Sequence, residues 1–147
     1  MSLVENKKVR FDYEILERFE AGLELVGHEV KSLRAGKADL AGSRVLIRGG
    51  EAYLVGATIH PYQAKNLPDK FEEGRNLRLL LTNKELVQLA EIESKKGLTI
   101  VPLSIYNKGK RLKLDLAIAR GKKKFDKRQI IKKREADREI RRTLKNQ

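Results

Sequence analysis

Apolar residues alternate with polar ones along three stretches of this chain, and this period of two constrains the fold more than any other feature. The alternation runs over residues 11–25, 101–105 and 112–118. Successive side chains of a strand point to opposite faces, so such stretches are typical of strands with one buried face. Residues 11–25 also fit a helical spacing, but their aromatic and branched side chains, with Gly22 and Gly27 among them, favour a bent strand.

Glycine and proline indicate where the strands turn or bend. Gly49-Gly50 joins two further strand candidates, residues 43–48 and 51–57, and it favours a hairpin because both glycines can take positive φ. A second hairpin is predicted at the turn residues 107–109. Pro102 lies inside a predicted strand, where it indicates an edge position or a bulge because it has no N–H to donate.

Two helices are predicted between the strands. Residues 82–85 (Thr-Asn-Lys-Glu) fit a capping box, in which the threonine hydroxyl accepts from the glutamate backbone and the carboxylate accepts in return. They begin a helix expected over residues 83–96, directly after a buried strand over 77–81. A shorter helix is expected over residues 28–35, with Gly36 as its end.

These segments together predict a fold class. Three strands, a helix and two more strands form the order of the five-stranded oligonucleotide-binding barrel, whose open face and loops bind nucleic acid. Residues 60–76, with two prolines and a glycine, are expected to form a long loop. We therefore expect a mainly β protein with helices: an OB-fold-type antiparallel β-barrel over residues 1–119, followed by a basic C-terminal tail, residues 120–147, that is flexible or helical.

The tail holds most of the positive charge. From Arg120 to Gln147 there are 13 Lys and Arg against four Asp and Glu, a net charge of +9 out of +13 for the whole chain. Charge of this density attracts a polyanion by counterion release, and nucleic acid is the commonest polyanion. A solvated basic tail with no single target is the alternative.

The composition argues against catalysis. The chain has no Cys and only two His, and it lacks a P-loop, a dinucleotide fingerprint and a nucleophile elbow. No enzymatic activity, metal or cofactor is therefore expected. No apolar run is long enough for a membrane span, and no signal peptide is expected, so a cytoplasmic location without membrane contact fits.

Several short motifs occur along the chain in a fixed order. They are Asn6-Lys7-Lys8-Val9-Arg10, Phe19-Glu20-Ala21-Gly22, Glu29-Val30-Lys31-Ser32-Leu33-Arg34-Ala35-Gly36-Lys37, Leu79-Leu80-Leu81, and Gly121-Lys122-Lys123 through Asp126-Lys127-Arg128. Together they resemble the SsrA-binding protein (SmpB) family of bacteria over nearly the whole chain. The nine-residue run from Glu29 to Lys37 is specific by itself.

The resemblance implies a function as well as a barrel. Members bind the tRNA-like domain of transfer-messenger RNA and deliver it to stalled ribosomes, where incomplete chains are tagged for degradation and the ribosome is released. The barrel would hold the elbow of the tRNA-like domain, and the tail would enter the small-subunit decoding region and the empty messenger channel. The working form is expected to be a monomer.

Charge and resemblance together give the candidate RNA-binding residues of the barrel. Lysines and arginines would contact phosphate, whereas the Glu20 carboxylate can only accept hydrogen bonds, for instance from base amino or imino groups. A surface salt bridge is the alternative for Glu20, and a turn cap is the alternative for Asn6. The candidates are Asn6, Lys7, Lys8, Arg10, Glu20, Lys31, Arg34, Lys37, Arg75, Arg78 and Leu80.

The candidate ribosome contacts lie in the tail. Phe125 is its only aromatic residue, and its ring could stack on a nucleobase or pack back onto the barrel. The family often has His at this position, so proton transfer there is disfavoured. Leu77 and Thr82 also depart from the family, which tends to have a basic residue and His or Asn there. The tail candidates are Lys122, Lys123, Lys124, Phe125, Asp126, Lys127, Arg128, Lys132, Lys133 and Arg134.

Two other functions compete with this interpretation. The first is another basic ribosome-associated protein with the same barrel, such as a ribosomal protein or an initiation factor. The second is an RNA-processing hydrolase, which is disfavoured because the sequence offers no metal ligands and no paired nucleophile and base.

Overall fold

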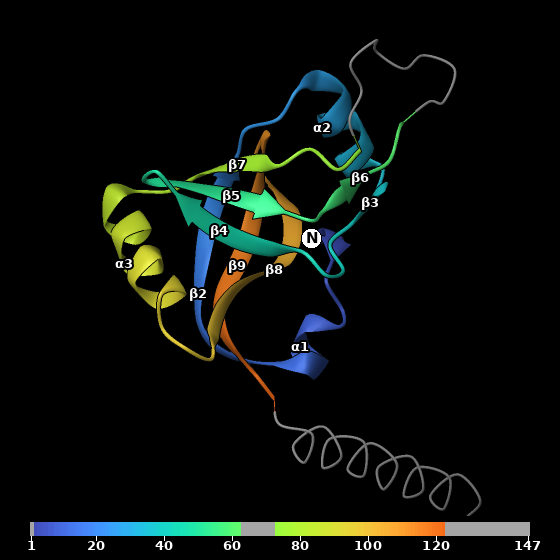
Figure 1. Ribbon diagram of the computed structural model, residues 1–147. Helices are drawn as coiled ribbons and strands as arrows, with labels where there is room; N and C mark the ends of the chain where they lie inside the picture. Colours follow the sequence, from blue (N-terminus) through green and yellow to red (C-terminus); the bar gives the residue numbers. More distant parts are fainter. Residues whose placement is uncertain (1, 63–72, 123–147) are drawn as a thin grey trace, which may run out of the picture.

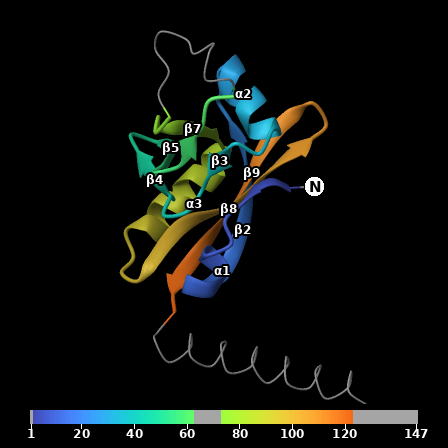
Figure 2. The same ribbon diagram turned by 90° about the vertical axis from the view of Figure 1, so that its right-hand side faces the viewer.

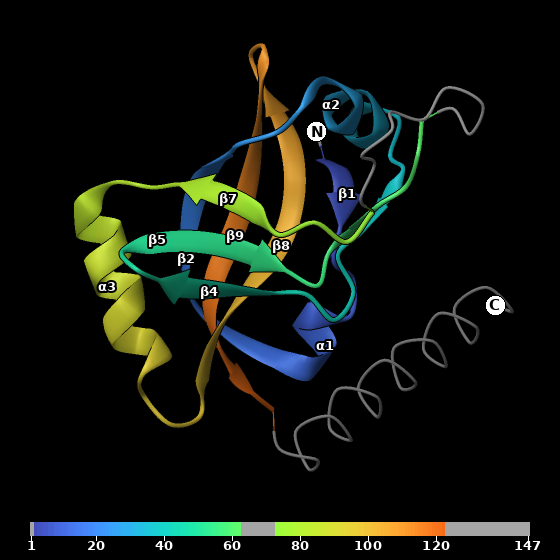
Figure 3. The same ribbon diagram turned by 45° about the horizontal axis from the view of Figure 1, so that its top comes forward.

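The computed structural model describes residues 2–62 and 73–122, which fold around one curled sheet of seven antiparallel strands. The β4–β5–β7 part of the sheet crosses in front of the β2–β9–β8 part, and β4 packs against β8 (Figures 1 and 3). The predicted mainly β class is confirmed, in the form of a sheet whose edge strands β1 and β4 are not paired with each other in the described residues. The strand order is β1 (Ser2–Glu5), β8 (Leu98–Lys108), β9 (Arg111–Gly121), β2 (Tyr13–Leu23), β7 (Leu77–Leu80), β5 (Glu51–Val55), β4 (Arg44–Arg48).

Within the described residues, three helices and a small second sheet surround the large one. α1 (Val9–Asp12) lies beside β2 and β8, α2 (Gly27–Arg34) lies beside β1, and α3 (Asn83–Glu93) packs on β4 and β8. The second sheet pairs β3 (Ala38–Asp39) with β6 (Thr58–Ile59). Figure 2 shows the β8–β9 hairpin extending past the rest of the large sheet on the side of α2.

The main core fills the space between the two crossing parts of the sheet. It is built from the buried face of each strand, and each fully buried aliphatic side chain contributes about 1.5–3 kcal/mol relative to exposure. Leu89 of α3 joins it and is fully buried. The largest fully buried residues of this core include Leu54, Leu77, Leu79, Leu89, Ile100, Ile105, Leu114 and Leu116.

A bulge in β2 explains why Glu17 interrupts the alternation of that segment. The pairing of β2 with β9 shifts by one residue between Ile15 and Glu17. Because one inserted residue turns the strand over, Tyr13 and Ile15 pack on a second cluster under α1, whereas Phe19 packs on the main core. The predicted bent strand is confirmed. Its apolar side chains lie on both faces of the sheet, whereas the alternation predicted that all of them lie on one face.

The turn and bulge predictions are confirmed. Gly49 and Gly50 have φ of 58° and 75° and connect β4 to β5. Gly109 has φ of 63° at the tip of the β8–β9 hairpin. The register of that hairpin shifts between Pro102 and Ser104, so the proline stands at a bulge.

The capped helix forms as predicted and ends earlier. The Thr82 hydroxyl accepts from the backbone N–H of Glu85 at 3.2 Å, and the Glu85 carboxylate accepts from the backbone N–H of Thr82 at 3.0 Å. α3 ends at Glu93, three residues before the expected end. Ser94 follows as the C-cap, and its hydroxyl donates to the Glu91 carbonyl at 2.7 Å, which closes the last turn locally.

The sequence did not predict the shortest elements. α1, β1, β3 and β6 have two to four residues each, too few to carry a period. Most of the expected loop over residues 60–76 lies outside the described residues. β9 continues through Arg120 to Gly121, the first two residues assigned to the tail, and the helix expected in the rest of the tail lies outside the described residues.

Candidate nucleic-acid interface

One side of the large sheet, here called the outer face, has polar side chains where the other side has the core. The outer face is formed by β8, β9, β2 and β7, and strand register determines which of its residues are neighbours. Gly22 of β2 pairs with Lys113 of β9 and with Leu80 of β7. Lys113 in turn pairs with Tyr106 of β8. A row of neighbouring residues, two with polar side chains, a glycine and a leucine, thus continues across four strands.

Glu20 lies at the middle of the outer face and is held by two donors. The Tyr106 hydroxyl donates to its Oε2 at 2.5 Å, and the Lys108 ammonium donates to its Oε1 at 2.9 Å. The hydrogen bond from Tyr106, followed by that from Lys108, lowers the pKa of Glu20 below its usual value. Burial and the bond to Glu20 raise the pKa of Tyr106. Glu20 is therefore an ionised acceptor with a fixed orientation, and its side chain is still 40% exposed.

Leu80 adds an exposed apolar side chain next to Glu20. It is 50% exposed, which is unusual for a leucine in a sheet, and it lies against the backbone of Gly22. A Cβ added at Gly22 would lie 3.1 Å from the Leu80 Cβ, so the glycine allows the two strands to present Leu80 in this position. An exposed apolar side chain beside polar groups suits contact with the face of a nucleobase.

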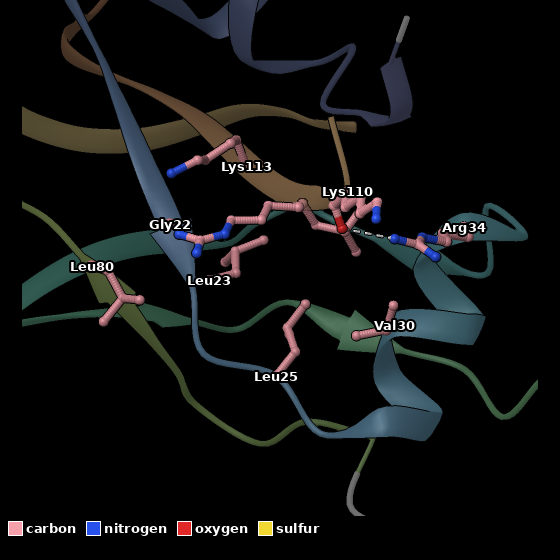
Figure 4. Close-up of a pocket in the computed structure, with 10 residues that line it drawn as sticks. Gly22, Leu23, Leu25, Val30, Arg34, Leu80, Lys110 and Lys113 are labelled. Atoms are coloured by element: carbon pink, nitrogen blue, oxygen red, sulfur yellow. Dashed lines mark hydrogen bonds between the residues drawn. The ribbon is translucent and has the colours of Figure 1, made fainter. Parts of the chain in front are cut away.

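A groove continues from Leu80 toward α2 and the tip of the β8–β9 hairpin (Figure 4). Its volume is about 420 Å³. Four of its lining residues are basic and none is acidic, and the basic residues are Arg34, Lys110, Arg111 and Lys113. The Arg34 guanidinium donates to the Lys110 carbonyl at 3.0 Å and so joins α2 to the hairpin. The apolar side chains beneath are Leu23, Leu25, Val30, Leu80 and Leu112.

Glu29 occupies a different environment from Glu20. It is only 2% exposed, and the Arg75 guanidinium donates to both of its oxygens, at 2.6 Å and 3.1 Å. The backbone N–H of Val26 donates to it at 2.9 Å. Burial raises the pKa of Glu29, but the bonds from Arg75 and Val26 outweigh it, so the pKa is lowered overall. This pair ties the start of α2 to the segment before β7.

Two other predicted cations near α2, Arg78 and Lys37, are also bonded within the protein. Arg78 donates to Glu51 and to Glu24, each at 3.0 Å. The Lys37 ammonium donates to the Tyr62 carbonyl at 2.9 Å and lies 5.3 Å from the centre of the Tyr62 ring. These ion pairs and contacts are exposed, so RNA phosphates can compete for the same cations. Lys31 lies on the exposed side of α2.

The N-terminal candidates lie at another part of the sheet. Lys7, Lys8 and Arg10 are exposed around α1. Asn6 is 8% exposed, and its side-chain amide donates to the Pro102 carbonyl at 3.0 Å, while its backbone N–H donates to the Leu103 carbonyl at 2.9 Å. Asn6 thus fastens the start of the chain to the bulge of β8.

A shallow cavity connects the N-terminal candidates with the outer face. Lys7, Arg10, Arg18 and Asp115 all line it. Arg18 lies 3.9 Å from Asp115, which is the β9 residue opposite Glu20. Burial raises the pKa of Asp115, and the charges of Arg18 and Arg10 oppose that shift.

The sequence did not indicate the part of the candidate interface that the final hairpin contributes. These residues share a simple signal: they occupy the strand positions that alternate with the core leucines, or they flank the turn at Gly109. That signal would have been sufficient, because period two assigns Lys113 to the face opposite Leu112 and Leu114. The missed hairpin residues are Tyr106, Lys108, Lys110, Arg111 and Lys113, and Arg18 of β2 was missed as well.

Only the first tail candidate is described. The Lys122 backbone N–H donates to the Asp12 carbonyl at 2.9 Å, and its ammonium donates to the Arg10 carbonyl at 2.9 Å. The tail therefore leaves the sheet at α1. The other nine tail candidates, from Lys123 to Arg134, lie outside the described residues.

The described residues offer neither a metal site nor a membrane-spanning helix. Residues 2–62 and 73–122 contain no group of three or more His, Cys, Asp or Glu side chains placed to hold a metal ion. In the same residues, no helix has the length and apolar character needed to cross a membrane.

Comparisons with known proteins cover nearly the whole chain. A family model described as SmpB protein matches residues 3–146. An SsrA-binding protein of Chlorobaculum tepidum is 47% identical over 141 residues, which cover 95% of this chain and 89% of the relative. An SsrA-binding protein of Clostridium tetani is 44% identical over 145 residues, which cover 99% and 92%. A solved structure presented as "tmRNA-SmpB: a journey to the center of the bacterial ribosome" contains a similar chain, with a TM-score of 0.68, 48% identity, and coverage of 82% of this chain and 84% of that one.

Proposed function

Because this chain belongs to the SmpB family, we propose that it is an RNA-binding adaptor that binds the tRNA-like domain of transfer-messenger RNA and delivers it to stalled bacterial ribosomes. The observation that carries the proposal is the match to SsrA-binding proteins over nearly the full chain, at 44–47% identity. The outer face supports it physically, since it combines cations, a fixed acceptor and an exposed leucine. Structured RNA is recognised through phosphates and unstacked bases, which need those three kinds of contact.

The two parts of the chain would have separate tasks. The sheet and α2 would bind the tRNA-like domain, and the basic tail, with a net charge of +9, would enter the decoding region and the vacant messenger channel of the small subunit. The bonds between Lys122 and α1 support a fixed point of departure for the tail. The other tail candidates, Phe125 among them, remain proposed contacts with the ribosome.

We further propose that the protein has no chemistry of its own, needs no cofactor and works as a monomer in the cytoplasm, where bacterial ribosomes are. Another ribosome-associated barrel protein is not favoured, because relatives that match 95–99% of this chain are SsrA-binding proteins.

A binding panel tests RNA choice. The full chain, at one fixed moderate salt concentration, is expected to prefer the tRNA-like domain of transfer-messenger RNA over ordinary tRNA and over ribosomal RNA fragments. Salt must be fixed because phosphate contacts alone give affinity without selectivity. Equal affinity for all three RNAs would favour the other ribosome-associated proteins instead.

Removal of Lys123 to Gln147 tests the division of tasks. The truncated chain keeps every described residue and ends at Lys122. We therefore expect nearly intact binding to the tRNA-like domain and loss of tagging in a reconstituted translation assay. If truncation instead abolishes RNA binding, recognition does not reside in the sheet and α2.

A further inference from the structure

The Glu20 carboxylate of the outer face has a separate hydrogen-bond donor for each of its two oxygens. Oε2 accepts from the Tyr106 hydroxyl, and Oε1 accepts from the Lys108 ammonium. Two donors on two oxygens fix both the position and the plane of the carboxylate. A surface salt bridge with Lys108 alone would leave that plane free to rotate.

The carboxylate keeps unused acceptor capacity. An ionised carboxylate offers about four lone-pair positions, and these two bonds occupy one on each oxygen. The side chain is 40% exposed, so the remaining positions can be reached from solvent. Glu20 therefore offers two adjacent acceptors and no donor.

A depression beside Glu20 has room for a base. It has a volume of about 420 Å³, and Gly22, Leu80 and Lys113 line it together with Glu20. Gly22 has no side chain to obstruct it, and Leu80 offers an apolar surface. Two further carboxylates line it and already accept hydrogen bonds: Glu51 from Arg78, and Glu85 from Thr82.

The chemistry of the bases selects one of them. On its Watson–Crick edge guanine presents N1–H and the N2 amino group side by side, which are two adjacent donors. Adenine and cytosine each present a donor next to an acceptor, and uracil presents one donor between two acceptors. A carboxylate that can only accept is complementary to guanine and is repelled by the acceptors of the other three bases.

We propose that Glu20 binds the Watson–Crick edge of one unpaired guanine of the RNA, and that Tyr106 is the positioning residue that gives the carboxylate its specificity. The guanine ring lies against Leu80, and the adjoining phosphates lie along the basic groove toward Lys110 and Arg34. This inference rests on the proposed function, because it names the nucleotide that the outer face recognises. Lys108 holds the other oxygen and also adds a cation for phosphate.

Inosine substitution tests the inference directly, since inosine lacks only the N2 amino group of guanine. Each unpaired guanosine of the tRNA-like domain is replaced in turn, and the dissociation constant is measured with the full chain. At one position inosine is expected to weaken binding by about tenfold, the scale of one good bidentate contact. The other positions are expected to show little change.

Protein variants then assign the effect to the two residues. Glu20→Gln replaces one acceptor by a donor. We expect it to abolish the penalty, that is, the loss of affinity that inosine causes at that position. Tyr106→Phe keeps the ring and removes the hydroxyl, so the penalty is expected to shrink while binding to the inosine RNA stays nearly unchanged. Tyr53→Phe, a matched change on β5, is expected to leave the penalty as in the unaltered chain, and thermal unfolding confirms that all variants are folded.

The outcomes separate this inference from the proposed function. If no inosine position matters, or if the penalty persists in Glu20→Gln, the guanine contact is wrong even though the tRNA-like domain is preferred. A penalty that Tyr106→Phe leaves intact removes the positioning role alone. Conversely, a guanine penalty without any preference for the tRNA-like domain overturns the proposed function and leaves the contact standing.

Discussion

Glu29 and Glu20 show how burial separates two sites made from the same groups. Each carboxylate accepts bonds from a basic side chain and from one further donor, and each has a lowered pKa. Glu29 is 2% exposed and bonded to Arg75, whereas Glu20 is 40% exposed and bonded to Lys108. The buried Glu29 carboxylate leaves no room for a partner molecule and serves the fold. An exposed pair contributes little to stability and remains accessible to a partner molecule.

Removal of Arg75 should produce the largest effect on stability. Arg75→Met leaves the buried Glu29 charge without its cation, and we expect it to lower the free energy of unfolding by about 2–3 kcal/mol. This lies at the low end for a broken buried pair, because the Arg75 side chain is itself 37% exposed. Urea unfolding followed by circular dichroism measures the loss.

Arg78→Met is the matched control, because Arg78 forms exposed ion pairs with Glu24 and Glu51. We expect it to change the free energy of unfolding far less than Arg75→Met does. The opposite ranking of the two arginines would show that burial does not distinguish these pairs. If Arg75→Met leaves stability unchanged and abolishes RNA binding, then Arg75 is an RNA contact, as the sequence suggested, and no structural anchor.

Removal of Glu20 should give the complementary result. Glu20→Ala is expected to weaken binding to the tRNA-like domain by about tenfold, because one charge-assisted acceptor is lost. The free energy of unfolding should change little, since the pair with Lys108 is exposed. Fluorescence anisotropy with labelled RNA, compared with a melting curve of the same sample, measures both. A large loss of stability would place Glu20 with Glu29 among the structural carboxylates.

The sequence predicted the longer strands and α3 because their signals are local. The Gly49-Gly50 turn, the bulge at Pro102 and the capping box at Thr82 each depend on a few adjacent residues, and all three are confirmed. β3 and β6 have two residues each and form only because tertiary contacts bring them together. No pattern within two residues can indicate such a pair.

The candidate site could be predicted only in part, because the charge of a side chain does not show which residue or molecule it pairs with. Arg75 and Arg78 are basic residues in a basic chain, so nothing in their neighbourhood showed that Glu29, Glu24 and Glu51 engage them. Those pairings join residues 27 to 54 positions apart. Tyr106 was missed for the same reason, since its bond to Glu20 spans 86 positions and requires β9 to lie between their strands.

A third carboxylate gives the smallest and most specific test of the comparison. Asp115 lies opposite Glu20, and burial raises its pKa above the ordinary value of 3.8. A raised pKa in the folded state means that folding favours the protonated carboxyl, so stability is present below the unfolded pKa and is lost as the pH rises through the folded pKa. Asp115→Asn removes that loss, and we expect it to stabilise the protein at pH 7 by less than about 1 kcal/mol.

The pKa of Glu29 is shifted in the opposite direction from that of Asp115, so its contribution to stability changes with pH in the opposite sense. The lowered pKa of Glu29 means that its contribution is present above the unfolded pKa, ordinarily 4.5, and is lost as the pH falls through the folded value. Between about pH 3 and pH 6, Asp115→Asn should therefore gain stability relative to the unaltered chain as the pH rises, and Glu29→Gln should lose it. Urea unfolding at several pH values measures both slopes. Slopes of the same sign would mean that the bonds from Arg75 do not overcome the cost of burying Glu29. Glu29 would then not be a stabilising structural carboxylate, and its contrast with the exposed Glu20 would be wrong.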